Sequence, residues 1–112
     1  MQDAKSKVEI RRFNGGIVLT LKDEIISRYR QVEGLKQEIL RILENEQAPR
    51  IVLDFANVRF FNTPFFSLII KIRQTAGNLE LCNLDRNVRQ VLEVTDLMKI
   101  FPICKDPLHC SA

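Results

Sequence analysis

The feature that most constrains the fold is a nearly continuous apolar run in the middle of the chain, Ile51-Val52-Leu53-Asp54-Phe55. A strand with one wet face alternates apolar and polar residues, whereas an almost unbroken apolar run is typical of a strand covered on both faces. A helical pattern precedes the run, and Gln47-Ala48-Pro49 separates the two. We therefore predict a central strand, Arg50–Phe55, parallel to the strand to which this helix connects it.

The chain before that helix predicts a β-hairpin. Two candidate strands, Val8–Phe13 and Ile17–Leu21, flank the segment Asn14-Gly15-Gly16. Asparagine and glycine tolerate the positive φ of a tight turn, so this segment favours a hairpin connection.

An amphipathic helix comes after the hairpin and ends at Glu46. Its apolar residues recur at three- and four-residue steps with charged residues between them; they are Val32, Leu35, Ile39, Ile42 and Leu43. Residues 22–29 have no clean period, so the pattern leaves the helix start open between Glu24 and Arg30.

A second helix is predicted from Thr63-Pro64 to Ala76. A hydroxyl at the N-cap with proline at the first helical position is a common helix start, because the N–H that proline lacks would have no partner there. Gly77 fits the left-handed residue that ends many helices. Further along, residues 78–83 alternate as a strand does. Asp85 is then predicted to cap a short helix that carries Val88, Val91 and Leu92. Residues 100–104 favour an edge strand, since they contain Pro102.

The order of these elements predicts an α/β fold: a single two-layer domain with a mixed β-sheet and helices mainly on one face. The sheet opens with the N-terminal hairpin and continues through right-handed β-α-β-α-β-α-β crossovers. A chain of 112 residues makes one domain, and we expect its core over residues 8–105, with flexible tails at 1–7 and 106–112. The second helix then starts beyond the C-terminal edge of the central strand, where open α/β sheets tend to bind ligands and partners.

Charge and hydropathy argue against two classes of partner. The net charge of +3 is spread along the chain, whereas a nucleic-acid binder gathers its basic residues on one face, so we expect no nucleic-acid partner. The longest apolar stretch, Phe65–Ile72, contains Ser67 and Lys71 and is far shorter than the ~20 residues that cross a bilayer, so we expect no membrane insertion. The polar N-terminus does not resemble a secretory signal, which favours the cytoplasm.

The residues that could carry metal or catalytic chemistry are few. Cys82, Cys104 and Cys110 form no Cys-x-x-Cys pair, which suits a reducing compartment. His109 beside Cys110 lacks a fourth ligand at zinc spacing, so we expect no metal. His109 is also the only histidine and lies three residues from the end, so no catalytic constellation is indicated. We expect neither an enzyme nor a cofactor.

Four segments resemble the STAS domain family, which contains the anti-sigma factor antagonists and their relatives in bacterial stress signalling and anion transport. The segments are Ile51–Phe55, Val58–Thr63, Leu79–Leu84 and Val88–Leu97. The resemblance covers roughly residues 8–105 and implies a regulatory module that docks on an anti-sigma factor or a histidine-kinase-like ATPase. The alternative within the same family is a structural subunit, never phosphorylated, of a stressosome-like or transporter-associated complex.

In the antagonist branch the start of this helix usually reads Asp-Ser-Ser-Gly, and the partner kinase phosphorylates the first serine. These four positions fall on Asn62, Thr63, Pro64 and Phe65, so only the hydroxyl is kept. The resemblance implies phosphorylation of Thr63. The residues alone allow a simpler role, an N-cap whose hydroxyl accepts a backbone N–H from Phe65 or Phe66, worth ~1 kcal/mol.

We expect the partner-binding surface to centre on this helix start. Its predicted members are Arg59, Asn62, Thr63, Pro64, Phe65 and Phe66. Phe66 lies ~100° around the helix from the row that covers the sheet, so it is either part of a wide apolar stripe or a partly exposed anchor for a partner.

Overall fold

The computed structural model describes residues 6–46, 50–76, 78–95, 99 and 103–104. Along the chain these residues form β1 (Val8–Phe13), β2 (Gly16–Leu21), β3 (Ile25–Ile26), α1 (Tyr29–Asn45), β4 (Arg50–Asp54), β5 (Phe60–Phe61), α2 (Thr63–Ala76), β6 (Leu79–Cys82), α3 (Arg86–Val94) and β7 (Ile103–Cys104). Predictions for residues 1–5, 77, 100–102 and 105–112 lie outside the described residues.

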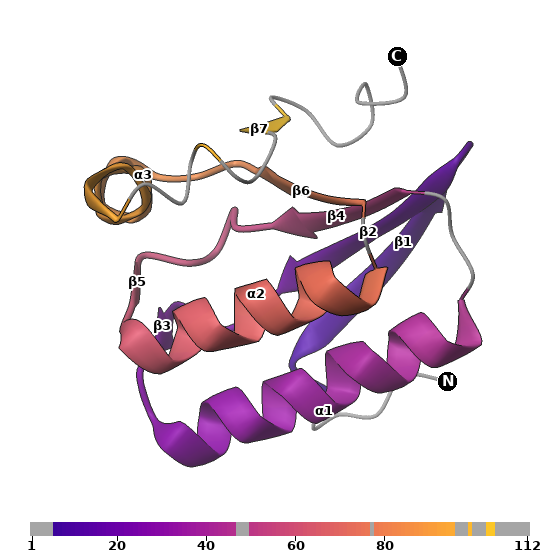
Figure 1. Cartoon of the computed structure of the whole chain (residues 1–112), viewed down its shortest axis with the longest axis horizontal. Helices are drawn as coiled ribbons and strands as arrows, with labels where there is room; N and C mark the ends of the chain where they lie inside the picture. Colours follow the sequence, from indigo (N-terminus) through magenta and orange to yellow (C-terminus); the bar gives the residue numbers. More distant parts are fainter. Residues whose placement is uncertain (1–5, 47–49, 77, 96–98, 100–102, 105–112) are drawn as a thin grey trace.

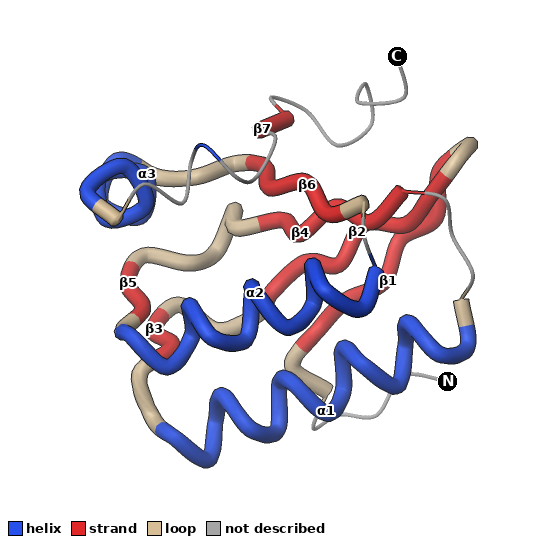
Figure 2. Tube along the Cα trace, in the orientation of Figure 1, coloured by secondary structure: helices blue, strands red, loops and turns tan. Residues whose placement is uncertain are grey.

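The main sheet has the strand order β1-β2-β4-β6-β7 (Figures 1 and 2). Strands β1 and β2 pair antiparallel, and β2, β4, β6 and β7 pair parallel to one another. Helices α1 and α2 lie side by side on one face of this sheet, and α3 lies beyond the C-terminal end of β6. The predicted two-layer α/β domain with a mixed sheet is confirmed, and β4 is its central strand.

The burial of β4 explains its apolar sequence. Leu53 points into the larger core beneath α1 and α2, together with residues such as Leu19 and Ile39. Val52 packs with Val18 and Cys82 on the opposite face of the sheet. At the edge of this second cluster, Glu80 accepts hydrogen bonds of 2.8 Å from Arg50 and thereby raises the pKa of that guanidinium.

The hairpin turn uses its two glycines for different reasons. Gly15 adopts a φ of +103°, which side-chain-bearing residues rarely reach. Gly16 already belongs to β2, and a Cβ there would lie 2.3 Å from the carbonyl oxygen of Arg50 on the neighbouring strand. The second glycine is therefore required by the close approach of β4, not by the turn.

The start of α1, which the sequence left open, is fixed by Gln31. Its side-chain oxygen accepts the backbone N–H groups of Ser27 (2.9 Å) and Arg28 (3.2 Å). Its side-chain nitrogen donates to the Ile25 carbonyl oxygen at 2.7 Å. The short strand β3 therefore precedes the helix, which begins at Tyr29.

The Asp54 carboxylate binds four segments together at the C-terminal end of β4. The residue is 3% exposed. One oxygen accepts from the Ala56 N–H (3.0 Å) and the Asn83 amide (2.9 Å). The other accepts from the Thr20 hydroxyl (3.0 Å) and lies 3.5 Å from an Arg11 nitrogen. These bonds join β1, β2 and the loop after β6 to the central strand.

None of the described helices is both long enough and apolar enough to span a membrane.

We expect Asp54→Asn to lower the free energy of unfolding by about 3 kcal/mol, because an amide nitrogen would face donors and the charge that holds Arg11 would be lost. Chemical denaturation checks this. The control is Asp23→Asn, at a partly exposed carboxylate that accepts from Gln31 at 2.9 Å, where a change under about 1 kcal/mol is expected. Equal losses for the two variants would contradict the central role of Asp54.

Candidate partner-binding site at the start of α2

The start of α2 is held against the junction of β3 and α1. The Asn62 backbone N–H donates to the Ile26 carbonyl at 3.2 Å, and its side-chain amide donates to the Ser27 carbonyl at 2.6 Å. The Phe65 N–H donates to the Asn62 carbonyl at 3.0 Å, which closes the first turn. The side-chain oxygen of Asn62, Oδ1, is buried and has no hydrogen-bond partner among the described residues.

Thr63 is the first residue of α2 and is exposed. The helix thus begins one residue earlier than predicted, and Asn62 takes the position before it. No hydrogen bond to the Thr63 hydroxyl is present among the described residues, so the predicted capping role of Thr63 is wrong. The hydroxyl is left facing solvent at the end of the helix where backbone N–H groups point outward.

Phe65 and Phe66 have different environments. Phe65 is fully buried, and its ring packs edge-on against Phe61 and Phe55 at centroid distances of 4.9 and 5.9 Å. Phe66 is half-buried and packs edge-on against Phe61 at 5.1 Å. A partner cannot contact the Phe65 side chain directly, so we remove Phe65 from the predicted surface. Phe66 was predicted to be either a core residue or a partly exposed anchor for a partner, and its partial burial is compatible with both roles.

Arg59 connects the site to α3. It is exposed, and one guanidinium nitrogen lies 3.6 Å from a carboxylate oxygen of Asp85. Asp85 also accepts the Val88 N–H at 3.1 Å, so the predicted cap of α3 is confirmed. The chain just before the site is therefore tied to the last described helix.

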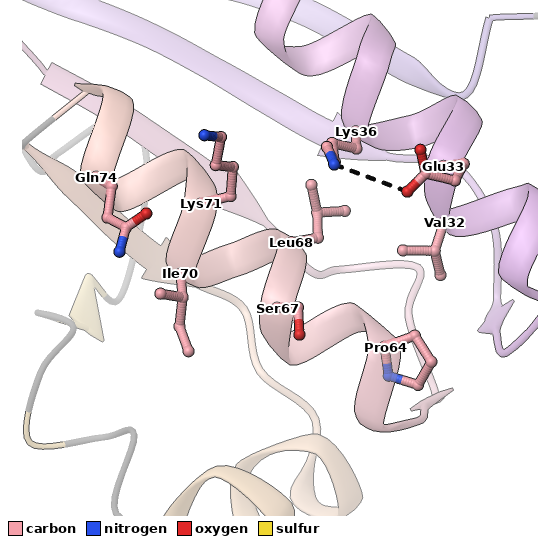
Figure 3. A pocket seen from close by; sticks show the side chains of 9 residues that line it. All are labelled: Val32, Glu33, Lys36, Pro64, Ser67, Leu68, Ile70, Lys71 and Gln74. Carbon is pink, nitrogen blue, oxygen red and sulfur yellow. Dashed lines mark ion pairs between the residues drawn. The ribbon is translucent and has the colours of Figure 1, made fainter.

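Pro64 lies at one end of a groove between α1 and α2 (Figure 3). The groove has a volume of about 390 Å³. Its other lining residues mix apolar and charged side chains: Val32, Glu33, Lys36, Ser67, Leu68, Ile70, Lys71 and Gln74. Lys36 and Glu33 form an ion pair of 3.7 Å on the α1 side. Of the predicted members of the surface, Pro64 lines this groove, and Asn62 and Thr63 immediately precede it in the chain.

The sequence analysis missed the ribbon formed by β3 and β5. These two-residue strands pair in parallel, with Ile25 opposite Phe60 and Ile26 opposite Phe61. The available signal was the two apolar pairs Ile25-Ile26 and Phe60-Phe61, which are too short to show a period. Within the described residues, no group of three or more histidine, cysteine or acidic side chains is placed to hold a metal ion.

Comparisons with known proteins agree on one family. The family model of the STAS domain matches residues 7–107. An anti-sigma F factor antagonist from Paenibacillus polymyxa is 22% identical over 101 residues, which are 87% of this chain and 85% of that protein.

Two solved structures share the fold. One is a STAS domain protein from Planctomyces limnophilus, an anti-sigma-factor antagonist, with a TM-score of 0.80, 18% identity and 93% of each chain covered. The other is the Bacillus cell fate determinant SpoIIAA in its phosphorylated form, with a TM-score of 0.64 and 13% identity, covering 88% of this chain and 92% of that one.

The burial difference between the two phenylalanines gives a prediction for folding. Phe65→Ala is expected to cost about 3–5 kcal/mol of unfolding free energy, because it empties a site within the core. Phe66→Ala is expected to cost roughly half as much, because one side of the ring already faces water. Denaturant titrations of both variants measure this, and a loss for Phe66→Ala as large as that for Phe65→Ala would place Phe66 in the core.

Proposed function

The chain belongs to the STAS domain family, and from this premise we propose that it is a regulatory protein-binding module of the anti-sigma factor antagonist type. Its partner would be an anti-sigma factor that is also a histidine-kinase-like ATPase, and Thr63 would be the residue that this partner phosphorylates. The observation that carries the proposal is that Thr63, at the start of α2, is exposed and that its hydroxyl has no hydrogen-bond partner within the described part of the chain. Catalysis belongs to the partner in this scheme.

The chemistry at Thr63 is a phosphoryl transfer. The Thr63 oxygen would attack the γ-phosphorus of ATP bound to the partner, ADP would leave, and a base on the partner would take the hydroxyl proton. The product carries a charge near −2 at the N-terminus of α2, where the partial positive charge of the helix suits a phosphate. No acidic residue in that turn opposes it.

A phosphate on Thr63 would weaken partner binding. Binding would use the exposed surface around the helix start, formed by Arg59, Asn62, Thr63, Pro64 and Phe66. A phosphate at Thr63 adds bulk and negative charge at the centre of this surface, so the phosphorylated form would release the partner. Support comes from the Paenibacillus polymyxa relative, named an anti-sigma F factor antagonist, and from the phosphorylated form in which SpoIIAA was solved.

Phosphorylation is tested by incubating the chain with the anti-sigma factor of the same organism and ATP. The intact mass should increase by one phosphate, and fragmentation should place it on Thr63. Thr63→Val should abolish the increase, while Ser67→Ala, at an exposed hydroxyl one turn further along α2, should not change it. Stable binding without any phosphate would favour the alternative, a structural subunit of a larger complex.

Binding gives a separate test. Thr63→Glu is expected to weaken affinity for the anti-sigma factor by about tenfold, less than genuine phosphorylation does, because a carboxylate carries less charge. Phe66→Ala should weaken it by about 2 kcal/mol or more if the exposed part of the ring fills a pocket on the partner. Calorimetric titration measures both, with Thr63→Ala as the control that keeps wild-type affinity. Equal affinities for all forms would contradict the switch.

A further inference from the structure

The ribbon of β3 and β5 has an unusual outer face. Its inner pair, Ile26 and Phe61, is 0% and 3% exposed, whereas its outer pair, Ile25 and Phe60, is 55% and 52% exposed. The register places Ile25 directly beside Phe60. A ribbon with one face on the core ordinarily carries polar residues on the other. Two large apolar side chains held together in water indicate a surface that another molecule covers.

A third large side chain with apolar surface is exposed at the first residue of α1. Tyr29 is 71% exposed and lies three residues after Ile26, next to the bonds by which Gln31 fixes the helix start. We call Ile25, Tyr29 and Phe60 the ribbon patch. It lies at the end of the molecule where α1 and α2 both begin, on the left in Figure 1.

Beside the patch, two arginines without ion-pair partners among the described residues outnumber the one acidic side chain that has none. Arg28 precedes α1, Arg30 is its second residue, both are exposed, and neither takes part in an ion pair among the described residues. Three acidic residues lie nearby in the sequence. Glu24 is exposed, Asp23 is engaged by Gln31 at 2.9 Å and by Lys7 at 3.8 Å, and Glu33 pairs with Lys36 at 3.7 Å.

These arginines are in an unfavourable position for helix stability. The N-terminus of a helix carries partial positive charge, so cations there are disfavoured and acidic residues are preferred. The first turn of α1 contains no acidic residue. Two unpaired arginines at this place indicate a role in binding an anionic surface rather than in folding.

We propose that the ribbon patch, with Arg28 and Arg30, is a docking surface for a protein segment that presents an apolar side chain flanked by carboxylates. The inference rests on the proposed function in one respect: the segment belongs to the same partner that reaches Thr63. The two hydrogen bonds from Asn62 to Ile26 and Ser27 hold the patch and the start of α2 as one unit, so one partner can cover both.

A second copy of this chain is the less suitable occupant. A two-fold interface would place the same patch, with its excess of unpaired positive charge, on both sides. An acidic segment instead neutralises them and increases the association rate at low salt.

The first experiment titrates the purified anti-sigma factor against ribbon variants by calorimetry. Ile25→Ser with Phe60→Ser should weaken affinity about tenfold or more, whereas Val94→Ser, at a residue 78% exposed on α3, should change it less than about twofold. The Val94 variant should melt within a few degrees of the wild type, whereas the ribbon variant should melt lower, since Ile25 and Phe60 are about half buried. Affinities are therefore compared at a temperature where circular dichroism shows both variants fully folded.

The charge variants have a signature that a structural role would not produce. Arg28→Glu with Arg30→Glu should raise the melting temperature, because glutamate suits the helix N-terminus, and should at the same time weaken affinity about tenfold. Its affinity should also depend less on salt than that of the wild type. Unchanged affinity for both the ribbon and the arginine variants overturns the inference and leaves the proposed function intact.

The second experiment does not depend on the anti-sigma factor. A photo-crosslinking phenylalanine is placed at position 60 or, as control, at position 94 of the full chain in cells of its own organism. We expect one adduct, formed from position 60 only and lost with the arginine variant, whose partner is identified by mass spectrometry and has an acidic binding segment. An acidic partner other than an anti-sigma factor would support the ribbon patch and contradict the proposed function. No adduct, an adduct between two copies, or equal adducts from both positions overturns the inference.

Discussion

The carboxylate of Asp54 is the interaction on which the functional end of the molecule depends. It is buried at the point where the central strand leaves the sheet, and it binds donors from β1, from β2, from the loop after β6 and from the backbone just beyond its own strand. An unpaired carboxylate there would be very costly, so the four segments are held in one arrangement. Asn83, at a φ of 57°, adopts the left-handed backbone that asparagine tolerates and donates its amide to Asp54.

The segment between Asp54 and α2 is ordered by a chain of further bonds. The Ala56 N–H donates to the Asp54 carboxylate just after the strand ends, and the Asn57 side-chain amide donates to the Leu21 carbonyl at 3.2 Å. The chain then pairs with β3 and enters α2, and Asn62 bonds to both Ile26 and Ser27. Thr63 therefore belongs to a segment that hydrogen bonds hold in place before and at the helix start. A binding surface on such a pre-ordered segment loses little conformational entropy when a partner docks.

Most of the sheet could be predicted because its signals are local. The apolar run of β4, the hairpin glycines and the cap at Asp85 each act within a few residues. The β3–β5 ribbon could not be predicted, since a two-residue strand has no period and its pairing joins segments 35 positions apart. The helix boundary, and with it the capping alternative for Thr63, could not be predicted for a related reason: the long-range bonds of Asn62 set that boundary, and a Thr-Pro motif does not reveal them.

The residues whose placement is unfavourable for stability are concentrated at one end of the molecule. There, arginines occupy a helix N-terminus, Ile25 and Phe60 are exposed together, and the Asn62 side-chain oxygen is buried without a partner among the described residues. At the opposite end, the hairpin turn has glycine where the backbone requires it, and β2 packs closely against its neighbour β4. A sequence specifies a fold when local propensity, apolar patterning, packing and electrostatics all favour the same structure. Residues that are unfavourable for stability are therefore expected where another requirement acts. Because these features surround an exposed threonine on an anchored helix start, we infer that this requirement is recognition by a partner.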